Sequence, residues 1–322
     1  MATSFSVNGV QVYALSAGKS LPQWLSERTR RALNKDPEFR RRIELIQDFN
    51  FPSASQTVTL SGSGRYIIAT GTYPPRVRVF DTAELSMKFE RYMDGTPIAT
   101  VSLSDDFSKL AFLQDDRNIE VHAAYGRHYR TRIPTFGRDM VYHQPTAELL
   151  VAASGPEVYR LSLEEGRFMS PLACVAAEVN KVAVSRLTAL IGTAGAGGLL
   201  ELWDPRDTRA AATTLHIASD APGGGPVDLT ALAFSERALA VAVGTADGRA
   251  ILYDLRRAPP LVVKDHQYGL PVHTVQFHRQ ETNGGGAGTG SGPIVISADA
   301  RIIKLWHQVD VRRVTVVSLV LL

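Results

Sequence analysis

Short runs in which apolar and polar residues alternate recur along most of this 322-residue chain, and each run leads into a turn. Alternation with a period of two is typical of a β-strand with one buried face. The clearest runs are VRVFDT (77–82), IEVHAA (119–124), EVYRLSLEEG (157–166), LELWDPRDT (200–208), AILYDLRRA (250–258) and IIKLWHQ (302–308). The corresponding positions Phe80, His122, Leu161, Trp203, Tyr253 and Trp306 follow one another at steps of 42, 39, 42, 50 and 53 residues. The pattern predicts a repeated unit of short strands.

A repeat of about 40–45 residues that ends in Trp-Asp is typical of the four-stranded blade of a WD40 β-propeller. We therefore expect an all-β, WD40-type β-propeller over residues 56–308. Six blades are visible in the pattern, and the last is expected to be incomplete; if the ring has seven blades, most of one is absent. Two Gly-rich stretches, 221–226 and 283–293, lengthen the two longest repeats and are expected to be loops.

Residues 1–55 precede the repeats and differ from them. Val10 to Leu15 alternate and predict a strand, which we expect to close the ring by pairing with the last blade. Helix-start patterns at Ser20 and Asp36 predict two short helices, the second with Ile46 on its apolar face. Residues 309–322 show no blade pattern and are interpreted as an atypical, truncated end.

The net charge of +3 is concentrated in this N-terminal segment. Between Trp24 and Ile46, seven basic residues outnumber four acidic ones, so the rest of the chain sums to zero. The basic residues are Arg28, Arg30, Arg31, Lys35, Arg40, Arg41 and Arg42. They are candidates for contacts to RNA phosphates or to an acidic partner. A solvated helical face with ion pairs between residues four apart explains them equally well.

Catalytic and metal-binding patterns are not found in the sequence. The single Cys174 excludes an intrachain disulfide and a cysteine-based zinc site, and favours a reducing compartment. The Gly-rich stretch 192–198 lacks the Lys and Ser/Thr of a phosphate-binding loop, and no HExxH is present. The longest apolar stretch, 314–322, is too short to span a bilayer, and we expect no secretory signal. We expect no enzyme activity, cofactor, metal, membrane contact or small-molecule substrate.

Two loops, TGTYPPRVR (70–78) and VKDHQYGLPVH (263–273), are rich in aromatic and basic residues. Such residues on a fixed loop are typical of interaction surfaces, although turn chemistry explains them equally well. The candidate partner-contact residues are Tyr73, Pro74, Pro75, Arg76, Arg138, Lys264, Gln267 and Tyr268. A buried structural relay of hydrogen bonds is expected among His266, Ser297, Asp299 and Trp306.

Several of these stretches resemble the N-terminal propeller of the nucleolar protein 10 (Enp2-like) family. They include GKSLPQWLSERTRRAL (18–33), RRRIELIQDF (40–49), IIATGTYPPRVRVFDT (67–82), TRIPTFGRDMVYH (131–143) and LVVKDHQYGLPVHTVQF (261–277). The resemblance implies a non-catalytic scaffold of ribosome biogenesis in the nucleus and nucleolus. It implies that the partners are pre-rRNA, the U3 snoRNP-containing particle called the small-subunit processome, and other small-subunit assembly factors. The family pattern is lost after Gln308, and the Gly-rich insert at 283–293 is not a family feature.

A WD40 adaptor in another pathway, such as a ubiquitin-ligase substrate receptor, is the alternative interpretation. An adaptor needs only a protein ligand and no RNA. The basic residues of the N-terminal segment distinguish the two hypotheses, because a scaffold among RNAs has a use for positive charge that a protein adaptor does not require.

Overall fold

The structure, a computed structural model, describes residues 3–7, 10–14, 44–47, 51–217, 225–236, 239–257, 259–278, 294–307 and 314–317. Strands and two short 3-10 turns, Gln144–Thr146 and Ala196–Gly198, form the regular secondary structure of this part of the chain. The chain divides into two compact units, one with Met1–Asp116 and Glu120–Arg130, the other with Arg117–Ile119 and Thr131–Leu322.

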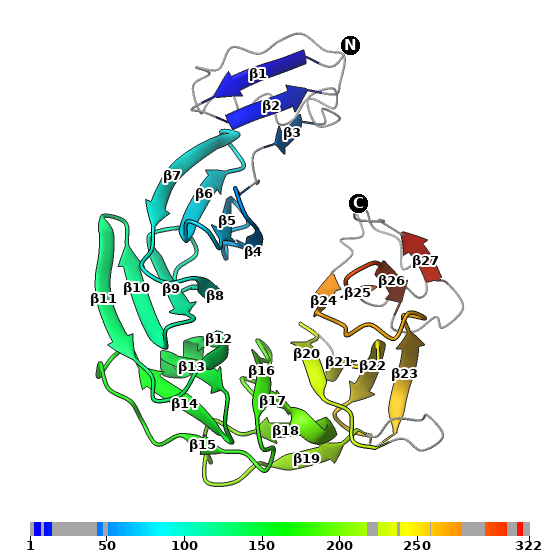
Figure 1. The fold of residues 1–322 in the computed structure, drawn as a ribbon. Helices are drawn as coiled ribbons and strands as arrows, with labels where there is room; N and C mark the ends of the chain where they lie inside the picture. Colours follow the sequence, from blue (N-terminus) through cyan, green and yellow to red (C-terminus); the bar gives the residue numbers. More distant parts are fainter. Residues whose placement is uncertain are drawn as a thin grey trace, which may run out of the picture. The chain divides into compact units, whose positions relative to one another are not determined.

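The first unit contains a three-stranded and two four-stranded antiparallel sheets (Figure 1). The three-stranded sheet consists of β1 (Thr3–Val7), β2 (Val10–Ala14) and β3 (Glu44–Gln47). Blade 1 consists of β4 (Ser55–Leu60), β5 (Tyr66–Gly71), β6 (Arg76–Asp81) and β7 (Ser86–Tyr92). Blade 2 consists of β8 (Pro97–Ser102), β9 (Lys109–Gln114), β10 (Asn118–Ala123) and β11 (Gly126–Arg132).

Four further four-stranded sheets, blades 3 to 6, belong to the second unit. Blade 3 is β12 (Gly137–His143), β13 (Glu148–Ala153), β14 (Glu157–Ser162) and β15 (Leu172–Ala173). Blade 4 is β16 (Val179–Val184), β17 (Ile191–Gly195), β18 (Leu199–Trp203) and β19 (Thr213–His216). Blade 5 is β20 (Leu229–Phe234), β21 (Ala240–Thr245), β22 (Arg249–Asp254) and β23 (Pro260–Asp265). Blade 6 is β24 (Thr274–His278), β25 (Ile294–Ala298), β26 (Ile303–His307) and β27 (Val314–Val317).

The predicted all-β fold with six WD40-type blades is confirmed. Each of the six repeat positions lies on the third strand of its blade, namely Phe80 on β6, His122 on β10, Leu161 on β14, Trp203 on β18, Tyr253 on β22 and Trp306 on β26. The repeat therefore marks one structural position, at which a large side chain is buried in the blade.

The hydrophobic core lies between successive blades of each unit. Leu150 of blade 3 packs in one cluster with Val182 and Trp203 of blade 4. The second strands of blades 1 to 5 are largely buried on both faces, and all six residues of β13 are buried. Apolar residues on both faces of a strand are expected when sheets stack face to face, because each face meets another sheet.

A β-bulge recurs in the first strand pair of five blades, a feature the sequence pattern does not predict. The register shifts by one residue in the first strand of blades 1 to 5. The extra residues are Gln56, Ile98, Arg138, Asn180 and Thr230. Bulges twist a strand and redirect a side chain, so these residues occupy equivalent, specially oriented positions.

Three predictions about the chain ends are wrong. Strand β2 pairs with β1 and β3, not with the last blade. Blade 6, predicted to be incomplete, has four strands. Its fourth strand is β27, which lies within the tail 309–322 and pairs with β26. Glu44–Gln47, predicted as helix, forms β3 because pairing with β2 outweighs the local helical spacing. The two predicted helix starts and the stretch 283–293 lie outside the described residues.

Candidate functional site: a buried relay and exposed blade edges

The four residues of the expected relay lie within hydrogen-bonding distance of one another. Trp306 Nε1 donates to Ser297 Oγ at 3.3 Å. Ser297 Oγ lies 2.8 Å from His266 Nε2, and His266 Nδ1 lies 3.1 Å from Asp299 Oδ2. All four are buried. The relay joins the loop after β23 to the second and third strands of blade 6, so its role is structural.

The relay fixes the protonation state of His266. Burial lowers the pKa of His266, and the nearby Lys304 acts in the same direction, against the carboxylates of Asp299 and Asp265. The neutral ring then donates from Nδ1 to Asp299 and accepts from the Ser297 hydroxyl at Nε2. Although burial opposes it, hydrogen bonds from the backbone N–H groups of Arg301 and Ile302 and from His266 hold the pKa of Asp299 below its usual value.

We expect the free energy of unfolding to fall as the pH drops below about 6.5, because unfolded histidine titrates there. Because the pKa of His266 is lowered in the folded chain, the unfolded chain takes up a proton at a higher pH than the folded chain does. His266 therefore favours the folded chain above about pH 6.5 and the unfolded chain below it. Chemical denaturation between pH 7.5 and pH 5 measures this slope. His266→Gln, which does not titrate, should show a shallower slope, and an equal slope in both proteins would contradict the assignment. A residual slope is expected from His122, whose pKa burial also lowers.

Blade 4 carries a partial version of the relay. Trp203 Nε1 donates to Thr193 Oγ1 at 3.3 Å. Cys174, not histidine, lies on the other side of Thr193, with its Sγ at 3.8 Å from Thr193 Oγ1. Burial and the neighbouring Glu201 raise the pKa of the Cys174 thiol to about 12. A thiol that stays protonated is a poor nucleophile, so Cys174 is a packing residue.

The TYPPR loop is divided between an exposed and a buried part. Tyr73, at the turn between β5 and β6, is 75% exposed. Arg76 is buried and donates to Glu90 Oε1 at 2.6 Å, and its guanidinium lies 5.6 Å from the Phe51 ring centre. Tyr73 is therefore available to a partner, whereas Arg76 holds β6 against β7 and Phe51.

Arg138, another candidate contact residue, connects two blades. As the bulge residue of blade 3, it hydrogen-bonds Asn180, the bulge residue of blade 4, and Glu178 Oε2. Asn180 in turn donates to the carbonyl oxygen of Leu229 at 2.8 Å, and Thr230, the bulge residue of blade 5, donates to that of Val272 at 2.7 Å. The bulges thus direct polar side chains into a series of bonds between blades 3, 4, 5 and 6.

The loop after β23 presents one exposed aromatic residue. Tyr268 is 55% exposed, and the Arg301 guanidinium lies 5.7 Å from its ring centre. Gln267 has a positive φ of 74° and its N–H donates to Asp265 Oδ1 at 2.8 Å, so it belongs to the turn. Lys264 lies on β23 and pairs across the sheet with Ala250. Of these three candidates, Tyr268 has the geometry of a contact residue.

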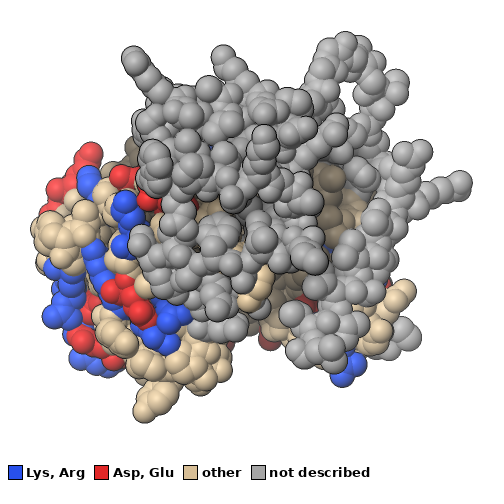
Figure 2. Space-filling view, turned by 90° about the horizontal axis from the view of Figure 1, so that it is seen from above, with Lys and Arg blue, Asp and Glu red and all other residues tan. Residues whose placement is uncertain are grey.

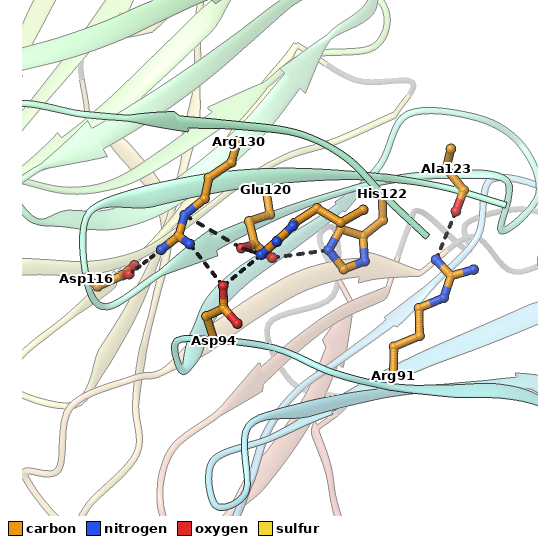
Figure 3. A network of polar contacts seen from close by, with 8 residues as sticks. Arg91, Asp94, Asp116, Glu120, His122, Ala123 and Arg130 are labelled. Atoms are coloured by element: carbon orange, nitrogen blue, oxygen red, sulfur yellow. Dashed lines mark hydrogen bonds and ion pairs between the residues drawn. The ribbon is translucent and has the colours of Figure 1, made fainter. Parts of the chain in front are cut away.

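The outer strands of blade 2 carry a charged network that the sequence reasoning missed (Figure 3). Arg127 and Arg130 both donate to Asp94 Oδ2, at 2.7 and 2.9 Å. Arg130 also donates to Asp116 Oδ2 at 3.0 Å. Glu120 is buried beneath them, with Oε1 3.4 Å from Arg127 and 3.7 Å from Arg130. The two guanidiniums are thereby held in place at the edge of the sheet.

The same network extends to β7 of blade 1. His122 is buried and hydrogen-bonds Glu120 Oε2 through Nε2 at 3.2 Å. The guanidinium of Arg91 donates to the carbonyl oxygens of Ala123 and Ala124, at 2.9 and 2.5 Å. Arg91 thus joins the outer strand of blade 1 to the end of β10 in blade 2, within the first unit.

A family model described as the nucleolar protein 10-like N-terminal domain matches residues 3–319. The chain belongs to the nucleolar protein 10 family. Nucleolar protein 10 of Homo sapiens is 47% identical in an alignment of 309 residues that covers 94% of this chain and 43% of the human protein.

Fungal members of the nucleolar protein 10 family are also similar to the chain. The ribosome biogenesis protein enp2 homolog of Schizosaccharomyces pombe is 40% identical in an alignment of 315 residues that covers 94% of this chain and 48% of that protein. Ribosome biogenesis protein ENP2 of Saccharomyces cerevisiae is 37% identical over 310 residues, 95% of this chain and 42% of that protein. The chain spans less than half the length of these relatives.

The basic residues Arg28 to Arg42 of this nucleolar protein 10 family member lie outside the described residues, so their role stays a prediction. Within the described ranges, no group of three or more His, Cys, Asp or Glu residues is arranged to hold a metal ion. In the same part of the chain, no helix has the length and apolar character needed to cross a membrane.

Proposed function

We propose that this chain is a non-catalytic scaffold of ribosome biogenesis that acts in the nucleolus, within the small-subunit processome. The observation that carries the proposal is the family match over residues 3–319, together with relatives named for the nucleolus and for ribosome biogenesis. A series of stacked blades supports a scaffold role, because it offers many loops and edges on a rigid core. Its partners are then pre-rRNA, the U3 snoRNP-containing particle and other assembly factors.

The exposed side chains fit this role. Tyr73 in the first unit, and Phe136 and Tyr268 in the second, are large aromatic residues exposed at blade turns. Aromatic side chains supply much of the binding energy at protein interfaces when a partner covers them. Each unit therefore offers contact positions to a neighbour in a large particle.

The test is sedimentation of the tagged chain from cell extract, with sequencing of the RNA that co-purifies. We expect migration with large particles that contain U3 and unprocessed pre-rRNA. Migration as a free protein with no such RNA would contradict the proposal for this chain. A partner protein from ubiquitin ligation in place of these RNAs would support the adaptor alternative.

The basic N-terminal segment is tested in the same experiment. We expect replacement of Arg40, Arg41 and Arg42 by Ala to reduce the fraction of the chain in particles several-fold, because each phosphate contact contributes to affinity. The matched control replaces Arg206, Arg209 and Arg256, which are exposed on turns of blades 4 and 5. Equal particle association of both variants and the parent, with native circular dichroism, would remove the segment from the mechanism.

A further inference from the structure

The outer edge of blades 1 and 2 combines exposed tyrosines with cationic side chains. Tyr92 at the end of β7 is 67% exposed, Tyr125 in the turn before β11 is 76% exposed, and Tyr129 on β11 is 50% exposed. β7 and β11 are the last strands of their sheets, and no further strand of the described residues pairs with their outer edges. In Figure 2, Lys and Arg side chains mix with Asp and Glu on the side where Figure 1 places β7 and β11. We call the surface formed by Lys88, Arg91, Tyr92, Tyr125, Arg127, Tyr129 and Arg130 the tyrosine edge.

Arg91 has an unusual environment for a cation. Its guanidinium donates to two backbone carbonyl oxygens and lies 4.1 Å from the Phe89 ring centre. Within the described part of the chain it has no carboxylate partner, and burial lowers its pKa. A partly buried cation without a counter-charge is stabilised when an anion binds beside it. Arg91 therefore favours an anionic partner.

Arg127 and Arg130 add two oriented guanidiniums. Both are held by Asp94, and both side chains remain substantially exposed. Asp94 and Asp116 lie at the surface beside these two arginines, whereas Glu120 is buried. Lys88, exposed on β7, is a further cation of the tyrosine edge. Arginines that are already positioned lose little freedom when they bind phosphate.

We propose that the tyrosine edge binds single-stranded RNA, with bases stacked on Tyr92, Tyr125 and Tyr129 and phosphates contacted by Arg91, Arg127 and Arg130. The inference rests on the proposed function and names the class of partner. Exposed aromatic residues interspersed with cations are typical of surfaces on which unpaired bases stack. Duplex RNA offers no free base faces at its sides, so it does not use the tyrosines. An acidic protein would use the cations but gains less from three separate tyrosine rings.

The test is fluorescence anisotropy of the purified full chain with a labelled 20-nucleotide oligouridine and with a duplex RNA of the same length. We expect the triple variant Tyr92→Ala, Tyr125→Ala, Tyr129→Ala to lose about tenfold or more in affinity for the single strand, because each stacked base contributes substantially. The corresponding triple Phe variant, which keeps the rings, should bind within about twofold of the parent. Phe168→Ala, at an exposed aromatic residue of the second unit to which no partner contact is assigned, should change nothing.

The phosphate contact has its own measurement. Arg91→Gln removes the charge and keeps a polar side chain at this position. We expect the slope of log affinity against log salt to become shallower by about 0.7, the value for one contact to a single strand. Circular dichroism of every variant checks the fold. An unchanged slope in a folded Arg91→Gln protein would overturn the assignment of Arg91.

Several outcomes would overturn the inference. They are absence of oligouridine binding by the parent, unchanged binding by the folded triple Ala variant, an equal loss in the triple Phe variant or in Phe168→Ala, and equal tyrosine dependence of duplex binding. If polyaspartate displaces the RNA, and the triple Ala variant binds polyaspartate as much more weakly than the parent as it binds RNA, the edge is assigned to an acidic protein instead. If one of these outcomes is found while the triple Ala variant still sediments with precursor particles, only this inference fails and the scaffold proposal stands.

Discussion

Replacing Trp203 with alanine is expected to lower the free energy of unfolding of the second unit by about 3–5 kcal/mol, the usual cost of removing a buried tryptophan. Trp203 is almost fully buried and packs in one cluster with Leu150, Val182 and Ile191. Its Nε1 also donates to Thr193. The variant therefore leaves a large cavity between blades 3 and 4 and an altered polar contact beside it.

Hydrogen exchange measured by mass spectrometry is the appropriate readout, because a chain with two compact units need not unfold in one step. Peptides from β13 and β17 should lose protection in Trp203→Ala. Trp203→Phe retains most of the volume and should cost less than the Ala variant. Leu187→Ala, at an exposed position, should change the stability by less than about 0.5 kcal/mol. Unchanged protection of the β13 and β17 peptides in Trp203→Ala would show that the stability of blades 3 and 4 does not depend on this cluster.

The blade repeat was predictable because its signal is local. Phe80, Trp203 and Trp306 end runs in which the alternation and the following turn lie within ten residues, and all three are on third strands. Strands β3 and β27 were not predicted, because their four residues become strand only through pairing with β2 and β26. The bulges depend on register between strands, which a single strand's sequence does not specify.

The candidate contact residues show the same division. Of the candidate contact residues, Tyr73 and Tyr268 are exposed, whereas Arg76 is buried by contacts with Phe51 and Glu90. The blade 2 network was not predicted, because its residues are distant in sequence: Asp94 and Arg130 are 36 residues apart. Charged residues that are unremarkable in sequence become a site only when the sheets place them together.

The buried ion pair between Glu148 and Arg160 leads to the second large prediction. Arg160 Nε donates to Glu148 Oε2 at 2.9 Å and one terminal nitrogen donates to Oε1 at 2.8 Å, with both side chains buried between β13 and β14. We expect Glu148→Leu alone, or Arg160→Met alone, to destabilise the second unit by about 3–5 kcal/mol, because each leaves an uncompensated buried charge. Hydrogen exchange of blade 3 peptides measures the loss.

The double variant Glu148→Leu, Arg160→Met separates this cause from a simple loss of packing. It removes both charges and keeps apolar volume, so its stability should return to within about 1 kcal/mol of the parent. The exposed pair Arg186–Glu236, 3.3 Å apart, is the control and should contribute no more than about 1 kcal/mol. If the two single losses simply add in the double variant, the charges are not coupled, and the cost arises from shape instead. Recovery in the double variant would mean that blade 3 is stable with either two paired charges or two apolar side chains at these positions, and unstable only with one unpaired charge.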